Sequence, residues 1–256
     1  MQEPSAPSAG FSWTQDALLG GRLRLRQPRP GYRAGADAAL LAAAAEAKAG
    51  ERVLEAGCGA GAALLQAAAR WPDAAFAGVE RDPAALALAL DNIAANGLGE
   101  RVVAVAGDVA VGFAGLGLAR FDAAMANPPF FDDPATLRAP HPARRGAYMA
   151  DDGLEAWTGF LLDAVRDGGR ITVVHRADRL GDLLALLGRR AGSFRIRPVH
   201  PFGDAPAKRV LVRAVRGGRA PLVLLPPLVL HPRESQAKHT QAAEAILRGE
   251  AALGWD

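Results

Sequence analysis

The chain of 256 residues has one cysteine, few aromatic side chains and no long apolar run. The single cysteine, Cys58, excludes an intramolecular disulfide framework and a metal site built from a cysteine cluster. The longest apolar segments carry charges, and none approaches the roughly 18–20 residues that span a bilayer. We therefore expect a cytoplasmic protein that does not cross a membrane.

Two further absences concern the N-terminus and the histidines. Residues 1–13 lack the basic and apolar regions of a signal peptide, and their Pro, Ser and Ala content predicts a disordered leader. The five histidines are scattered without the spacing of a metal site. We expect no metal.

The charge is mildly positive, with a formal net charge of +3 and a pI of about 9.5. Arginines gather without an acidic residue at Arg22, Arg24, Arg26, Arg29 and Arg33. In "RLRLR" they alternate with leucine after a Gly-Gly pair, which predicts a two-stranded ribbon with one charged face. Such a face is either solvated surface or a phosphate contact, and the pattern leaves both readings open.

From residue 51 onward, strand-like and helix-like segments alternate. The predicted strands are 52–57, 74–80, 101–108, 120–127, 170–175, 193–202 and 207–216, and the predicted helices are 62–71, 83–97, 154–169 and 179–192. This alternation predicts an α/β fold with a doubly wound, mostly parallel, seven-stranded sheet. The last two strands are joined by few residues, so the last strand is expected to be antiparallel.

We expect one domain over residues 14–256, with a basic ribbon at 14–34 and a core at 35–219. The remaining residues, 220–256, form an appendage with a Pro-rich apolar stretch and a helix-like "TQAAEAILRGEAAL".

A glycine-rich segment, "LEAGCGAGAALLQ", joins the first core strand to the first core helix. It places Glu55, Gly57, Gly59 and Gly61 where glycines permit a tight turn and close approach of a ligand. Alone, this spacing also fits an NAD or FAD site, or a loop without a ligand.

Acidic residues end the next two predicted strands. Glu80 stands where a carboxylate can accept both ribose hydroxyls, and Asp108 where it can accept an adenine amino hydrogen. A glycine loop followed by acids at successive strand ends predicts a nucleotide cofactor at the carboxyl edge of the sheet.

The segment "MANPPFFDDP" carries the most specific signal. Asn127, Pro128, Pro129 and Phe130 follow the fourth predicted strand, and the prolines stiffen its exit. The Asn127 amide oxygen and the Pro128 carbonyl can each accept one N–H of an amino group, aiming its lone pair. Phe130 offers a face on which a base can stack, worth roughly 1–3 kcal/mol. The plainer alternative is a proline-stiffened loop with packing aromatics.

Together these motifs resemble the Rossmann-like class I methyltransferases. The glycine loop with its acids is similar to their S-adenosylmethionine site, which implies that cofactor, with Asn127 also beside it. The Asn-Pro-Pro-aromatic segment resembles the signature of amino methyltransferases, whose targets are nitrogens of adenine, guanine, cytosine or glutamine.

The segment "QPRPGYRAGADAALLAAA" resembles the bacterial enzymes that methylate adenine N6 in valine tRNA. That resemblance implies a tRNA substrate, and it implies that Arg33 and Asp37 frame the methionine end of the cofactor. Asp37 is alternatively a helix N-cap. Arg22, Arg24, Arg26, Arg144 and Arg145 become candidate RNA contacts, although a solvated loop explains the last two equally well. This chain departs from that family at Ala36, Glu55 and Phe130.

Other functions stay open. The alternatives within the same chemistry are glutamine methylation of release factors and amino methylation of ribosomal RNA or DNA. A non-catalytic nucleotide-binding module and an NAD-linked oxidoreductase are disfavoured by the intact Asn127, Pro128 and Pro129. Methylation of phenolic hydroxyls normally needs a base or a metal.

Overall fold

The computed structural model describes residues 13–29, 33–130 and 153–256. The expected leader up to residue 12, and the candidate RNA contacts Arg144 and Arg145, lie outside these residues.

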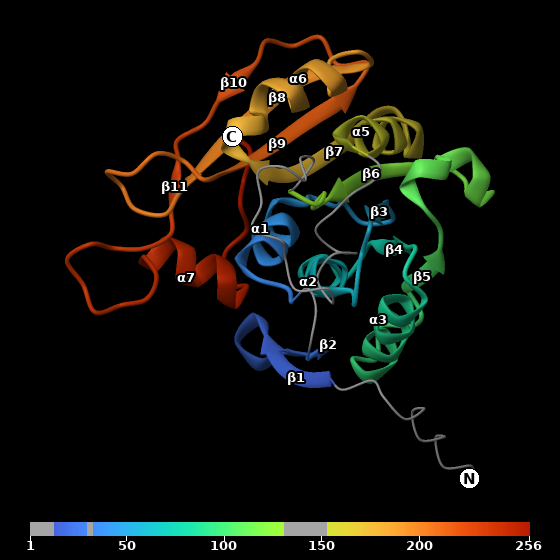
Figure 1. The fold of residues 1–256 in the computed structure, drawn as a ribbon, viewed down its shortest axis with the longest axis horizontal. Coiled ribbons are helices and arrows are strands. Elements are labelled where there is room, and N and C mark those ends of the chain that lie inside the picture. The colour runs from blue at the N-terminus through green and yellow to red at the C-terminus, as the bar shows by residue number, and fades with distance from the viewer. Residues whose placement is uncertain (1–12, 30–32, 131–152) are drawn as a thin grey trace.

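A mostly parallel sheet forms the centre of the molecule (Figure 1). Its main strands are β3 (Arg52–Ala56), β4 (Ala75–Glu80), β5 (Val102–Ala106), β6 (Phe121–Ala126), β7 (Val165–Arg176), β8 (Ala191–His200) and β9 (Arg209–Arg216). They lie in the order β8-β9-β7-β6-β3-β4-β5. Strands β3 to β7 pair in parallel, whereas β9 is antiparallel to both of its neighbours. The predicted seven strands and the antiparallel last strand are confirmed.

Helices cover both faces of this sheet, as a doubly wound fold requires. The described helices are α1 (Ala36–Ala44), α2 (Ala62–Arg70), α3 (Pro83–Ala95), α5 (Gly153–Ala164), α6 (Leu180–Leu187) and α7 (Gln241–Arg248). One apolar core lies under α1, α2 and α3, and a second lies under α5 and α6 (Figure 1). Over the described ranges, no helix combines the length and apolar character that crossing a bilayer requires.

Local sequence signals explain where α3 begins. The Asp82 side chain accepts the Ala84 N–H at 2.9 Å, and Pro83 occupies the first helical position. By contrast, α5 ends at Ala164, five residues before the predicted end of the helix at 169. The Arg216 guanidinium from β9 donates to the carbonyls of Leu162 and Val165, both at 2.7 Å. A tertiary contact therefore satisfies the Leu162 carbonyl in the last turn of α5 and the Val165 carbonyl that begins β7, which the local sequence could not indicate.

The N-terminal ribbon consists of β1 (Trp13–Leu18) and β2 (Leu23–Pro28), which pair antiparallel around the Gly-Gly turn. Trp13, which the sequence placed in the leader, begins β1. Leu23 and Leu25 are buried while Arg24 is exposed, so the predicted charged face is present.

Two asparagines hold this ribbon, Asn92 in α3 and Asn96 at the C-cap of α3. Asn92 accepts the Arg26 N–H at 2.8 Å and donates to the carbonyls of Arg26 and Ala60, both at 2.9 Å. One turn later, Asn96 makes the equivalent pair with the backbone of Arg24, at 2.9 and 2.7 Å. The free edge of β2 is thus paired by amide side chains in place of a third strand, and Asn92 also ties it to the glycine loop.

The C-terminal segment packs along the core. Its short strands β10 (Val223–Leu224) and β11 (Leu228–Val229) pair with β8, which extends the expected seven strands to nine. Farther on, Trp255 is buried and its indole N–H donates to the Ala44 carbonyl of α1 at 2.8 Å. Apolar residues of the appendage therefore belong to the first core.

Candidate active site

The carboxyl ends of four neighbouring strands bring most of the predicted site residues together. Strands β6, β3, β4 and β5 are adjacent and parallel, so their carboxyl ends meet at one edge of the sheet. This edge carries Asn127 after β6, Glu55 and the glycine loop at β3, Glu80 at β4 and Asp108 after β5. Ligands of doubly wound sheets bind at such an edge.

The glycine loop after β3 has a left-handed backbone at every second residue. The φ angles are 66° at Gly57, 54° at Gly59 and 87° at Gly61, the N-cap of α2. A Cβ on Gly57 would lie 2.9 Å from Cζ3 of Trp157 and closer still to Cη2, whereas one on Gly59 would meet nothing within 4 Å. Gly57 therefore packs under an aromatic ring, and Gly59 faces open space that a ligand can enter.

Glu80 holds this loop through its carboxylate. It accepts the N–H groups of Gly59 and Asp82, each at 2.8 Å. Because an ionised carboxylate offers about four lone-pair sites, it retains the capacity to accept ribose hydroxyls. Asp108 similarly accepts the Ala110 N–H at 3.0 Å and lies 3.8 Å from the Arg81 guanidinium.

Glu55 is buried at the foot of the loop, only 3% exposed. Its Oε2 has no hydrogen-bond partner among the described residues. Burial, with a further contribution from the nearby Glu80 charge, raises the pKa of Glu55 well above its ordinary value. Burial and the same two carboxylates also raise the pKa of the Cys58 thiol. The buried Oε2 is an acceptor that a positively charged ligand can meet, so the site fits such a ligand.

Asn127 is half-buried where β6 ends, with its Oδ1 atom buried, and Pro128 is buried behind it. The Phe130 ring meets His175 of β7 edge-on, at 5.5 Å between ring centroids, and the Arg209 guanidinium carbon lies 4.4 Å from its centroid. Its carbonyl accepts a hydrogen bond of 3.4 Å from Arg176. Phe130 is therefore held from several sides, and Arg209 covers one face of its ring.

Asp37 lies in the first turn of α1, whose N-cap is Gly35, so the alternative prediction that Asp37 caps the helix is wrong. Both of its oxygens accept from Arg209 Nε, at 3.2 and 3.1 Å. Asp37 cannot cap α1, because Gly35 already has the extended backbone of an N-cap and the helix starts at Ala36, two residues earlier than an Asp37 cap would require.

The other resemblance-based cofactor residue, Arg33, lies with the ribbon. It donates to Thr14 Oγ1 and, at 2.7 Å, to Asp16 Oδ2, and both partners of this ion pair are more than a third exposed. In the described residues it is thus Arg209, not Arg33, that meets Asp37.

Comparison with known proteins agrees with this geometry. The methyltransferase small domain family matches residues 34–140. A tRNA1(Val) (adenine(37)-N6)-methyltransferase of Porphyromonas gingivalis is 33% identical over 198 residues, which cover 74% of this chain and 77% of that protein. The chain belongs to the methyltransferase small domain family.

S-adenosylmethionine is the cofactor of this methyltransferase. A ribosomal protein uL3 glutamine methyltransferase of Bradyrhizobium diazoefficiens is 34% identical over 140 residues, 52% of this chain and 43% of that protein. A solved structure of a predicted O-methyltransferase from Agrobacterium tumefaciens superposes with a TM-score of 0.71 at 27% identity, over 85% of this chain and 98% of its own. The Rossmann-like class I fold expected from the sequence is confirmed.

The ribbon arginines of the methyltransferase differ in what they contact. Arg22 donates to the carbonyls of Arg248 and Gly249, at 3.2 and 3.0 Å, and so binds the C-terminal end of α7. Arg24 and Arg29 are exposed, and the Arg26 guanidinium carbon lies 4.6 Å from the ring centroid of the exposed Trp13. The outer face of the ribbon is therefore both basic and aromatic.

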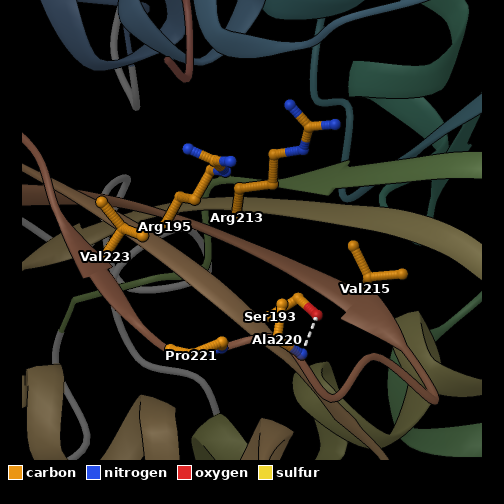
Figure 2. Close-up of a pocket in the computed structure, with 7 residues that line it drawn as sticks. All are labelled: Ser193, Arg195, Arg213, Val215, Ala220, Pro221 and Val223. Carbon is orange, nitrogen blue, oxygen red and sulfur yellow. Dashed lines mark hydrogen bonds between the residues drawn. The ribbon is translucent and has the colours of Figure 1, made fainter.

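A cavity of about 470 Å³ lies elsewhere, between β8, β9 and the segment before β10 (Figure 2). Arg195 and Arg213 line it from paired positions of the two strands. Arg195 donates to the Trp255 carbonyl at 2.6 Å, and Arg213 pairs with Glu46 at 2.7 Å. These arginines anchor the C-terminal segment and the residues after α1, so the cavity is a product of that packing and lies away from the candidate site.

Sequence reasoning missed several residues at the site edge. Trp157, His175 and Arg209 come from α5, β7 and β9, and each reaches the glycine loop or Phe130 across the fold. Nothing local marks them. Asn92 and Asn96 did carry a signal, since two amides one helical turn apart in a mostly apolar segment indicate a shared polar partner.

Proposed function

We propose that this methyltransferase transfers a methyl group to an exocyclic amino nitrogen, namely N6 of an adenine in tRNA. The observation that carries the proposal is Asn127-Pro128-Pro129-Phe130 at the carboxyl end of β6, beside the glycine loop. A relative that aligns over 74% of this chain, a tRNA adenine-N6 methyltransferase, supports the same substrate.

The chemistry asks for orientation more than for a base. An amino group conjugated to a purine is a weak nucleophile because its lone pair is delocalised into the ring. The Asn127 side-chain oxygen and the Pro128 carbonyl each accept one N–H, which draws the nitrogen toward tetrahedral geometry. Its lone pair would then point at the methyl group that the cofactor supplies, and the surplus proton would leave the nitrogen for solvent. Such orientation is worth several powers of ten in rate.

The chain's own residues fit the cofactor, which when bound supplies an electrophilic methyl group on a sulfonium. Glu80 and Asp108 would accept from its ribose and adenine, and Gly59 would leave room for it. Glu55 would balance its positive charge, as the unpaired buried Oε2 indicates. Asp37, in the first turn of α1, would lie at the amino-acid end.

The ribbon gives the substrate an electrostatic contact. Arg24, Arg26 and Arg29, with Trp13 under Arg26, form an outer face that suits phosphates and an unpaired base. Arg22 instead joins the ribbon to the C-terminal end of α7. The target adenine would be turned out of its stack to reach Asn127 and would pack against the Phe130 ring.

A second candidate is methylation of a glutamine side chain in a protein. It is favoured by the glutamine methyltransferase relatives, which are 34% and 32% identical to this chain over 140 and 156 residues. The same pair of acceptors at Asn127 and Pro128 would bind a primary amide.

The deciding experiment is transfer of label from S-adenosylmethionine into tRNA taken from a host that lacks this gene, followed by nucleoside digestion and mass spectrometry. We expect N6-methyladenosine with the wild-type enzyme. Asn127→Ala should lower kcat by at least about 100-fold, because the amino group loses an acceptor that orients it. Binding of S-adenosylhomocysteine, measured by calorimetry, should be retained.

Two results would contradict the proposal in different ways. Label in release factor or ribosomal protein but not in tRNA would move the substrate to glutamine and keep the role of Asn127. Full activity of Asn127→Ala on tRNA would remove that role from Asn127.

A further inference from the structure

Arg209 lies at the site edge because β9 runs antiparallel to β7. It begins β9 and pairs in register with Arg176, at the carboxyl end of β7. β9, which the sequence predicted only as the last strand, therefore places the Arg209 guanidinium at the end of the sheet where the cofactor and substrate motifs lie.

Its side chain contacts two segments that are far apart in sequence. Nε donates to both oxygens of Asp37 at the start of α1, and the guanidinium carbon stands 4.4 Å from the centroid of the Phe130 ring. Side chains of the ion pair are only 31% and 21% exposed. Arg209 is thus held in one orientation by Asp37 while its guanidinium covers a ring face.

We propose that Arg209 is a positioning residue for methyl transfer: it fixes the ring of Phe130 and links that ring, through Asp37, to the first turn of α1. Its role rests on the proposed function of the Asn-Pro-Pro-Phe segment. His175 meets the same ring edge-on and Arg176 binds its carbonyl, so β7 and β9 together set the position of Phe130.

The consequence for the reaction follows from covalent connection. Phe130 is two residues beyond Pro128, whose carbonyl is a proposed acceptor, and the intervening Pro129 makes the connection stiff. Motion of the ring therefore displaces the acceptors that orient the amino group, and a small misplacement lowers the rate steeply. A lysine at position 209 keeps the charge for Asp37 but lacks the planar group that stacks on a ring.

The chain provides a matched control in Arg213, four residues along the same strand and on the same face. Arg213 also forms an ion pair, with Glu46 at 2.7 Å, and its guanidinium carbon lies 5.9 Å from the centroid of the Trp255 ring. It differs in lying away from the site edge. Arg213→Lys therefore makes the same chemical change at a residue that has no proposed role in positioning Phe130.

The experiment compares kcat, KM and S-adenosylhomocysteine affinity for Arg209→Lys and Arg213→Lys, with the labelled transfer assay on tRNA. We expect Arg209→Lys to lower kcat about 10- to 100-fold, with KM for S-adenosylmethionine and the affinity changed less than about threefold. Arg213→Lys should leave kcat within about twofold. In the Phe130→Leu background, Arg209→Lys should add little, because the ring that it positions is gone.

A second readout separates this inference from the identity of the substrate. In protein labelled with 4-fluorophenylalanine, the ¹⁹F resonance lost in Phe130→Leu reports the ring directly. It should shift in Arg209→Lys and stay in place in Arg213→Lys, whichever molecule the enzyme methylates. An unmoved resonance, or equal and additive losses of kcat in both arginine variants, would overturn the positioning role. Failure of tRNA methylation alone would overturn only the proposed substrate.

Discussion

At the scale of single residues, two glycines of the glycine loop are required for different physical reasons. Gly57 and Gly59 both have positive φ, which costs other residues about 1–2 kcal/mol. Only Gly57 lies against a neighbour, the ring of Trp157, whereas Gly59 faces open space. The first glycine is therefore required by packing as well as backbone, and the second by backbone and by whatever the open space admits.

This difference predicts distinct outcomes for two alanine variants. Gly57→Ala should destabilise the protein by about 2–4 kcal/mol, because overpacking against Trp157 adds to the cost of positive φ. Gly59→Ala should cost only about 1–2 kcal/mol in stability, yet weaken S-adenosylhomocysteine binding because its methyl enters the open space. Urea unfolding and calorimetry measure the two effects. Equal stabilities of the two variants would contradict the packing argument at Gly57.

At the scale of elements, the N-terminal ribbon depends on α3 for the pairing of its outer edge. A two-stranded ribbon alone is marginally stable in water. Asn92 and Asn96 supply acceptors and donors to β2, and Asn92 also reaches the Ala60 carbonyl in the glycine loop. The basic face of the ribbon is thereby fixed relative to the cofactor loop, which a substrate contact at that face requires.

The two asparagines should differ in what their loss costs. Asn92 is fully buried, so Asn92→Ala leaves backbone groups unpaired in the interior, and we expect a loss of about 2–4 kcal/mol in unfolding free energy. Asn96 is half-exposed and water can replace its amide, so Asn96→Ala should cost about 1 kcal/mol. Hydrogen exchange should quicken at the Arg26 amide in the first variant. Unchanged exchange at the Arg26 amide would mean that the ribbon does not depend on the Asn92 side chain.

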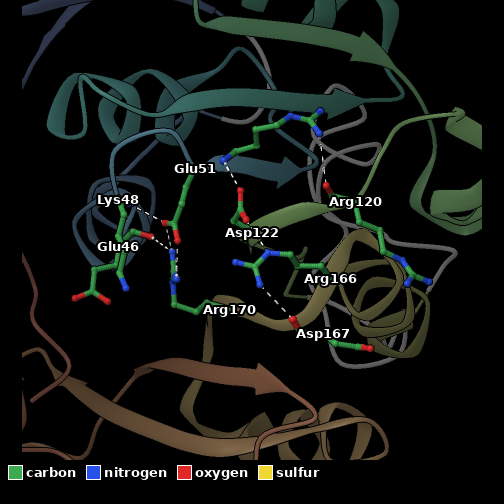
Figure 3. A network of polar contacts seen from close by, with 9 residues as sticks. Glu46, Lys48, Glu51, Arg120, Asp122, Arg166, Asp167 and Arg170 are labelled. Atoms are coloured by element: carbon green, nitrogen blue, oxygen red, sulfur yellow. Dashed lines mark hydrogen bonds and ion pairs between the residues drawn. The ribbon is translucent and has the colours of Figure 1, made fainter.

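At the scale of the whole molecule, a polar network lies at the amino ends of the strands, opposite the candidate site (Figure 3). Arg170 of β7 binds Glu51, whose Oε2 also accepts the Lys48 N–H at 2.7 Å, and Asp122 joins Arg166 to the Arg52 N–H. Burial alone would raise the pKa of Glu51. The hydrogen bonds from Arg170 and Lys48 outweigh it and hold the pKa of Glu51 below its ordinary value of 4.5. This network joins the amino ends of β3, β6 and β7.

The direction of this pKa shift predicts acid sensitivity. Because the pKa of Glu51 is lower in the folded than in the unfolded chain, its stabilisation is complete above the ordinary value of 4.5 and is lost as pH falls through the folded value. Arg170→Met should cost about 3 kcal/mol at pH 7, since it leaves a mostly buried carboxylate unpaired. The difference from wild type should shrink below pH 4.5.

A control for this prediction is Arg189→Met, which breaks an ion pair with Glu155 whose side chains are 61% and 68% exposed. That change should cost less than about 1 kcal/mol at any pH. Denaturant unfolding between pH 3.5 and 7 measures both variants. A wild-type advantage over Arg170→Met that does not depend on pH would show that Glu51 is not the titrating partner.

The sequence by itself determined the parts of this protein that depend on local pattern. Alternating apolar segments gave the strands and helices, because burial on a sheet or helix face imposes a period. The glycine loop, Glu80, Asp108 and Asn127 could be assigned to one edge, because parallel strands place their carboxyl ends together.

Only the tertiary structure decided which side chains from distant segments meet. The partner of Asp37 is Arg209, 172 positions away, and α5 ends where Arg216 of β9 binds the carbonyls of Leu162 and Val165. The position of the ribbon was likewise set by the contact of Asn92 with the Arg26 backbone. The position of the C-terminal segment was set by the hydrogen bond from Trp255 to the Ala44 carbonyl. Such contacts leave no local signal, because an arginine or an asparagine has the same sequence character whether it is solvated or joins two elements of the fold.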